Sequence, residues 1–117
     1  MATLYAYRRC STCRRALKWL EERGIAHTVQ DLKDSPPRAE TLQAVMARSG
    51  LPLKRFFNTS GQSYRGGGWK DRVGAVTLEE AAAALAADGM LIKRPLLVTD
   101  THVLVGFKAE AWEAALV

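Results

Sequence analysis

Two cysteines separated by two residues, Cys10 and Cys13, have a spacing that is typical of redox-active thiol pairs. The run at residues 3–7 before them carries the β-branched and aromatic residues of a strand. From Ser11 onward apolar residues recur at helical spacing, which predicts a helix with Cys10 at its N-terminus. Unpaired amides and the helix dipole favour an anion there, and Arg9 and Arg14 lie nearby in the sequence. We therefore expect a lowered pKa at Cys10, which makes it the nucleophile.

Cys13 falls one helical turn later, on the apolar face that it shares with Ala16, Leu17 and Leu20. This position is suited to attack on a mixed disulfide formed at Cys10. The pair therefore predicts a redox or thiol-transfer site in which Cys10 attacks and Cys13 resolves.

Two other interpretations of the cysteines stay open. One is a zinc half-site completed by a second copy of the chain, and the other is a pair of inert, buried cysteines. A zinc site usually needs four ligands, and this chain has only two cysteines and two isolated histidines, His27 and His102. We therefore expect no metal in this protein.

The composition is that of one globular domain of 117 residues, with 48% hydrophobic and 25% charged residues. No apolar run is long enough to span a membrane, and the N-terminus lacks the pattern of a signal peptide. With only two cysteines, we expect a cytoplasmic protein in which the pair is catalytic or sensing. We see no nucleic-acid recognition motif and expect no direct contact with nucleic acid.

The net charge of +5 includes a basic cluster around the cysteines. Such a cluster would stabilise a thiolate and attract anionic thiols or oxyanions, although a solvated helix face is the simpler explanation for any one of its members. The cluster consists of Arg8, Arg9, Arg14, Arg15 and Lys18.

The rest of the chain alternates between helical and strand patterns. In order, we predict a strand at 26–32, a helix with proline in its first turn that ends at Gly50, a short helix near 53–57, a loop at 58–68, a helix from Thr77 to 88–89, a hairpin of strands 96–98 and 103–105, and a helix at 108–116. Thr77-Leu78-Glu79-Glu80, at the start of the helix that begins at Thr77, has the form of a capping box. A right-handed crossover between the first two strands predicts that they are parallel.

This order, with Cys-x-x-Cys after the first strand, resembles the thioredoxin fold with a helical insertion. A closer resemblance is to the arsenate-reductase-like family, which includes glutaredoxin-linked arsenate reductases and proteins of the Spx and YffB types. The matching segments are residues 4–14, 50–53, 56–61, 88–95 and 105–107. The resemblance implies an α/β, thioredoxin-like fold with a mixed four-stranded sheet in the order β-α-β, then β-β-α. It implies a single domain at 1–117 with a helical insertion at about 37–89.

The resemblance also implies roles for individual residues. Cys10 matches the family's nucleophile, and Cys13 matches the second cysteine of Spx-type proteins, where arsenate reductases often have serine. Arg94 matches an arginine that binds the oxyanion in arsenate reductases, and Pro95 matches a cis-proline that faces the active cysteine. Arg14 matches a basic residue that follows the active loop.

We add Ser11 and Thr12, which lie between the two cysteines, to the expected substrate-binding residues. Two arginines of the family's oxyanion triad are missing, because Asn58 and Phe107 stand at their positions. Arg55 is the candidate to replace one of them. We therefore expect weak arsenate reduction, because charge-assisted donors contribute most to such a site.

Together, these features predict a cytoplasmic thiol-disulfide oxidoreductase, with arsenate reduction as a special case. We expect no bound cofactor, glutathione as a co-substrate, and small thiols, oxyanions, glutaredoxin or thioredoxin as partners of a monomer. The alternative is an Spx-type redox-sensing regulator that binds the α subunit of RNA polymerase.

Overall fold

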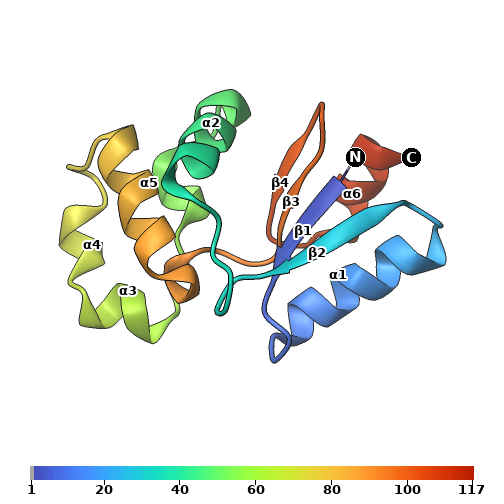
Figure 1. The fold of residues 1–117 in the computed structure, drawn as a ribbon, viewed down its shortest axis with the longest axis horizontal. Helices are drawn as coiled ribbons and strands as arrows, with labels where there is room; N and C mark the ends of the chain where they lie inside the picture. Colours follow the sequence, from blue (N-terminus) through green and yellow to red (C-terminus); the bar gives the residue numbers. More distant parts are fainter. Residues whose placement is uncertain (1) are drawn as a thin grey trace. The chain divides into compact units, whose positions relative to one another are not determined.

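The computed structural model describes residues 2–117, which form two compact units (Figure 1). The first unit consists of the segment that ends at Asp31 together with Arg94–Val117, and the second consists of Leu32–Lys93. The second unit contains the range 37–89 that we predicted as an insertion. Assignment of the whole chain to one domain stays a prediction.

A mixed four-stranded sheet and two helices make up the first unit, as the predicted thioredoxin-like fold requires. The sheet has the order β2-β1-β3-β4, in which β1 and β2 are parallel and the other neighbours are antiparallel. Leu4 of β1 is opposite Val29 of β2 and Leu97 of β3. The elements are β1 (Ala2–Ala6), α1 (Ser11–Glu22), β2 (His27–Asp31), β3 (Leu96–Val98), β4 (Val103–Val105) and α6 (Ala109–Leu116).

An aromatic cluster joins α1 to the end of the chain. The ring of Trp19 meets that of Trp112 edge-on, with centroids 5.8 Å apart, and Phe107 lies 4.9 Å from Trp112. Because of these contacts, Trp19 is buried beside Cys13, Ala16 and Leu20, whereas the predicted stripe contained Leu17, which is only half-buried. This cluster and the sheet residues Leu4 and Leu97 belong to one apolar core, which fixes α1 and α6 on the same face of the sheet.

Helices form almost all of the second unit. They are α2 (Ala39–Ser49), the 3₁₀ helix η1 (Leu53–Phe56), α3 (Gln62–Gly66), α4 (Trp69–Arg72), α5 (Leu78–Ala87) and the 3₁₀ helix η2 (Gly89–Leu91). The capping box is present: the Glu80 amide donates to the Thr77 hydroxyl at 3.1 Å, and the Thr77 amide donates to the Glu80 carboxylate at 2.8 Å. The hydrogen bond from the Thr77 amide, with a smaller contribution from the Thr77 side chain, lowers the pKa of the Glu80 carboxyl.

Two local predictions in this unit are wrong. The prolines do not lie in the first turn of α2, because Arg38 is its N-cap and Pro36 and Pro37 precede it. The expected loop at 58–68 contains α3, since tertiary contacts stabilise a segment whose glycines favour a loop. Tyr64 of α3 and Trp69 of α4 are both buried and pack against Phe57, with ring centroids 6.3 and 5.1 Å from it.

The segment that leads to Arg94 is fixed within the second unit by backbone hydrogen bonds. The Asn58 amide donates to the Leu91 carbonyl at 2.8 Å, and the Lys93 amide donates to the Phe56 carbonyl at 2.8 Å. Gly89 is buried at the start of this segment, and its α-carbon lies against the backbone of Leu32. No helix within residues 2–117 has the length and hydropathy needed to cross a bilayer.

Replacing Gly89 by alanine should destabilise the protein strongly. The added Cβ would overlap the carbonyl of Leu32, which is backbone and cannot rotate away. Overpacking of this kind typically costs about 1–3 kcal/mol, and more where the backbone must move. Urea unfolding followed by circular dichroism measures the effect.

Gly74→Ala is the matched control, because a Cβ at Gly74 has no neighbour within 4 Å. Its unfolding midpoint should equal or slightly exceed that of the wild type, since alanine restricts the unfolded chain. Equal midpoints for the Gly89 and Gly74 variants would contradict the close packing at Gly89.

Candidate functional site

Cys10 is the N-cap of α1, in the place usually taken by serine, threonine or aspartate. Its amide donates to the Tyr7 carbonyl at 2.9 Å, which closes the turn between β1 and α1. The Cys13 amide donates to the Cys10 sulfur at 3.3 Å, as the N3 amide of a capped helix does. The local sequence therefore places this sulfur where the helix terminus presents unpaired amides, as the helical periodicity predicted.

The pKa of the Cys10 thiol lies below its ordinary value. Partial burial acts in the opposite direction, because it disfavours the charged form. Hydrogen bonds from the Cys13 thiol and amide, together with the positive charge of Arg94 and a hydrogen bond from it, outweigh the burial. The result is a half-buried sulfur that forms its thiolate more readily than a free cysteine does.

Cys13 has the opposite property. Its side chain is buried on the inner face of α1, and burial together with a hydrogen bond from its thiol to Cys10 and the Cys10 charge raises its pKa to about 12. Of the two thiols, Cys10 is therefore the one that ionises first, while Cys13 keeps its proton. Because part of the shift at Cys13 comes from Cys10, its pKa will fall when the Cys10 sulfur forms a covalent bond and loses its charge.

Arg94 and Pro95 come to this site from the other end of the chain. The Arg94 guanidinium lies 5.4 Å from the centre of the Tyr7 ring, in addition to its interaction with Cys10. The Arg94–Pro95 peptide bond is cis, as the resemblance implied, and Pro95 is buried directly before β3. The Pro95 carbonyl accepts a hydrogen bond from the Gly106 amide at 2.8 Å, which fixes it to the end of β4.

The charge that lowers the Cys10 pKa comes from Arg94, whereas we expected Arg9 and Arg14 to contribute it. The Arg14 guanidinium is exposed and donates to the Arg8 carbonyl at 2.9 Å, so it fastens the turn before the helix. Sequence reasoning also gave no role to Tyr7. Its ring lies beside Arg94 and its carbonyl holds the Cys10 amide, and its position just before the cysteine turn was the available signal.

Ser11 and Thr12, the remaining predicted binding residues, occupy the first turn of α1. Ser11 is exposed, and the half-buried Thr12 accepts a hydrogen bond through its hydroxyl from the Arg15 guanidinium at 3.3 Å. The backbone amides of Ser11 and Thr12 belong to the same helix terminus as Cys10, where amides lack partners within the helix. A role of either residue in substrate binding stays a prediction.

A small apolar cavity of about 130 Å³ adjoins Cys13 within the first unit. Leu17 and Val29 line it, and its charged lining residues are Arg8, Arg14 and Asp31. The Val29 side chain is 53% exposed, which is unusual for a large apolar residue in this chain. The cavity therefore gives the cysteine region an apolar surface bordered by charged residues of both signs.

Phe107, at the expected position of a triad arginine, packs against Trp19 and Trp112 and offers no cation to an oxyanion. Asn58 belongs to the second unit, where its amide is bonded to Leu91, and Arg55 lines a cavity of that unit. No cluster of three or more potential metal ligands occurs within residues 2–117. That the protein binds no metal stays a prediction from the sequence.

Iodoacetamide should label Cys10 before Cys13 at neutral pH, because only the thiolate reacts and the two pKa values are shifted in opposite directions. Arg94→Gln should raise the Cys10 pKa, so the pH at which labelling is half-maximal should move upward and labelling at pH 7 should slow. Mass spectrometry of peptides labelled over a pH series measures both effects.

Arg14→Gln is the control, because it removes the same charge from a residue bonded to the Arg8 carbonyl. It should leave the labelling profile of Cys10 nearly unchanged. Preferential labelling of Cys13, or equal shifts for the two arginine variants, would contradict the assignment of Arg94 as the cation that stabilises the thiolate.

Comparison with known proteins covers nearly the whole chain. The ArsC family model matches residues 5–115. The Bacillus subtilis protein YusI, described as uncharacterized, is 46% identical over 111 residues, which cover 95% of this chain and 94% of YusI. The crystal structure of a possible arsenate reductase from Streptococcus mutans is 46% identical and superposes with a TM-score of 0.89, covering 97% of this chain and 98% of that one.

A more distant relative is a transcription regulator. The global transcriptional regulator Spx of Enterococcus faecalis is 22% identical over 110 residues, which cover 94% of this chain and 82% of Spx. The family model and the relatives at 46% identity agree with the predicted arsenate-reductase-like family and its thioredoxin-like sheet. This chain therefore belongs to the ArsC family.

Proposed function

We propose that this protein is a thiol-disulfide oxidoreductase in which Cys10 is the nucleophile and Cys13 is the resolving thiol. The observation that carries the proposal is the pair of opposite pKa shifts, which makes Cys10 the thiol that ionises first and leaves the proton on Cys13. Arg94 supports it by lowering the pKa of Cys10 from the side of β3. A pair of buried, inert thiols would give no such division.

In the first step, the Cys10 thiolate attacks one sulfur of a substrate disulfide. A bond forms between Cys10 and that sulfur, the substrate S–S bond breaks, and the other sulfur leaves as a thiolate that takes a proton from solvent. The negative charge on Cys10 is then gone. Because that charge helped to raise the Cys13 pKa, Cys13 now loses its proton more readily.

In the second step, the Cys13 thiolate attacks the Cys10 sulfur. A Cys10–Cys13 disulfide forms and the second substrate thiol is released, so the substrate gains two electrons and the protein loses two. The Cys13 amide already lies 3.3 Å from the Cys10 sulfur, so the two cysteines are held within the first turn of α1. Two molecules of glutathione, or one reduced thioredoxin or glutaredoxin, would then reduce the protein disulfide.

We accordingly propose glutathione as a co-substrate, with no bound cofactor, and small thiols or oxyanions as substrates. Glutathione and thioredoxin keep thiols reduced in the cytoplasm, and we place the activity there. The apolar cavity beside Cys13 would accommodate an uncharged part of a substrate.

Reduction of a glutathione mixed disulfide should be lost in Cys10→Ser, because serine is not ionised at neutral pH. Cys13→Ser should still form one mixed disulfide with glutathione at Cys10 but should release it only when external thiol is added. Coupled consumption of NADPH by glutathione reductase measures turnover, and intact-mass spectrometry detects the trapped adduct. Turnover that survives in Cys10→Ser would contradict the proposal.

Arsenate should be a poor substrate. Asn58 and Phe107 occupy two positions where the resemblance expects arginine, and each missing charge-assisted bond costs about 1.5–3 kcal/mol. Steady-state reduction with glutathione, thioredoxin and glutaredoxin supplied in turn measures the activity. The comparison is an arsenate reductase that carries all three arginines, and equal turnover by the two proteins would show that the missing charges do not matter.

The second candidate is a redox-sensing regulator, which is favoured by the match of Spx over 94% of this chain. In this case a disulfide between Cys10 and Cys13 would change the surface offered to the RNA polymerase α subunit. The same assay separates the two candidates. Lack of turnover in the wild type, together with polymerase binding that depends on the oxidation state and is lost in Cys13→Ser, would replace the enzyme by the regulator.

A further inference from the structure

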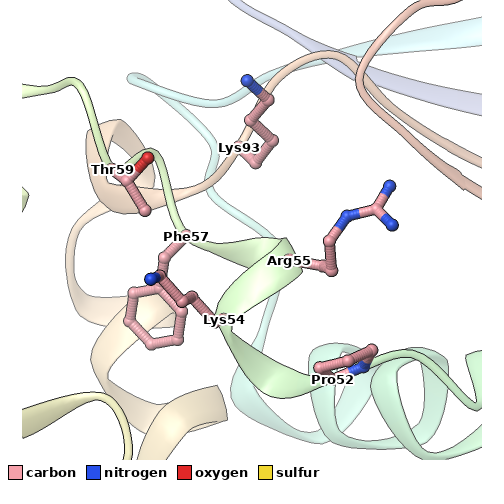
Figure 2. Close-up of a pocket in the computed structure, with 6 residues that line it drawn as sticks. All are labelled: Pro52, Lys54, Arg55, Phe57, Thr59 and Lys93. Carbon is pink, nitrogen blue, oxygen red and sulfur yellow. The ribbon is translucent and has the colours of Figure 1, made fainter.

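A second concave site lies wholly within the second unit and contains neither cysteine. It is a cavity of about 430 Å³ between the η1 turn and the segment that precedes Arg94 (Figure 2). Its volume falls in the range of small-molecule sites, about 300–1,000 Å³. The lining residues are Pro52, Lys54, Arg55, Phe57, Thr59 and Lys93.

The charge of this cavity has one sign. Lys54, Arg55 and Lys93 are cationic and exposed, and no acidic residue is among those that line the cavity. Within residues 2–117, none of these three side chains makes a hydrogen bond or ion pair. Three unneutralised cations around one cavity raise the local concentration of anions.

Two other cations of the same unit, Arg38 and Arg72, have partners. Arg38 pairs with Glu40 at 3.1 Å, and Arg72 donates to the Gly67 carbonyl and covers the Trp69 ring at 3.9 Å. The three cations of the cavity therefore differ from Arg38 and Arg72 in having no partner within the described residues. Their charge is left available for a ligand.

The spacing of these cations is fixed by the backbone. The Lys93 amide donates to the Phe56 carbonyl at 2.8 Å, and Phe57 and Ile92 form a β-bridge, so Lys93 is tied to the segment that carries Lys54 and Arg55. Figure 2 shows Lys54 and Arg55 extending from successive positions of the η1 turn and Lys93 from the neighbouring segment. The cations are therefore mounted on ordered elements.

The remaining lining residues indicate the kind of anion. The Thr59 hydroxyl can donate to an oxygen, and Phe57, which is 2% exposed, and Pro52 add an apolar wall. A phosphate group can accept charge-assisted hydrogen bonds from several lysine and arginine side chains at the same time. The cavity is larger than a single phosphate group needs. We propose that this cavity binds a small molecule carrying two or more phosphate groups, independently of the thiol chemistry at Cys10.

Isothermal titration of the full-length protein with ADP, pyrophosphate, inorganic phosphate and adenosine tests the proposal. We expect saturable binding of ADP or pyrophosphate that is tighter than that of inorganic phosphate. Equal affinity for ADP and pyrophosphate would identify the diphosphate as the recognised group. Tighter binding of ADP than of pyrophosphate would identify a nucleotide. Failure of both to saturate would overturn the proposal.

The decisive variant is K54Q/R55Q/K93Q, with K33Q/R65Q/K70Q as its matched control. Both variants remove the same charges from exposed residues of the second unit, but none of the control residues lines the cavity. The first should weaken binding by about tenfold or more, as loss of charge-assisted bonds predicts, while the second should leave it within about twofold.

Equal weakening in the two variants would show that binding follows net charge alone and would overturn the site. Circular dichroism and thermal unfolding of both variants confirm that the fold is kept. The iodoacetamide profile of Cys10 reports separately on the redox site. Loss of diphosphate binding with an unchanged thiol profile therefore tests this cavity apart from the proposed oxidoreductase activity.

Discussion

The hydrogen bond between the two cysteines is the interaction on which the site depends. It lowers the pKa of the Cys10 thiol and raises that of Cys13. It acts together with burial, which is partial for the Cys10 sulfur at the helix end and greater for the Cys13 sulfur in the core. A helix terminus alone lowers the pKa of a thiol modestly. The Cys13 thiol, one turn later, donates a hydrogen bond to the Cys10 sulfur, and Arg94 adds a positive charge. Together they lower the Cys10 pKa by more than partial burial raises it.

The position of α1 follows from the aromatic cluster at its inner face. Trp19 packs against Phe107 and Trp112, so α1 is held on the same surface as the helix that ends the chain. This packing has a chemical consequence. Phe107 stands where the family pattern has an arginine. Its ring packs against Trp112 at the border of the core, and it offers no cation to an oxyanion. This packing supports the proposed sulfur chemistry over binding of a bare oxyanion.

The second unit shows how tertiary packing overrides local tendency. Gly66, Gly67 and Gly68 predict a loop, and yet helices form on either side of them because Tyr64 and Trp69 both bury their rings against Phe57. Phe57 directly follows η1, which carries the exposed residues Lys54 and Arg55. The rigid aromatic packing is thus what gives those exposed cations a defined geometry, since short helices rich in glycine are not stable alone.

The sequence by itself determined the elements whose signals are local. The strand before Cys10, the helix after it, the capping box at Thr77 and the hairpin at 96–105 all follow from periodicity and turn chemistry within a few residues, and so does the place of Cys10 at a helix N-terminus. Tertiary structure alone decided which arginine lowers the Cys10 pKa. Arg9 and Arg14 are its neighbours in sequence, but Arg94 supplies the charge, because pairing of β1 with β3 brings distant segments together. The burial of Trp19 and the helices around Gly67 likewise depend on contacts between residues far apart in the chain, which no short window of sequence contains.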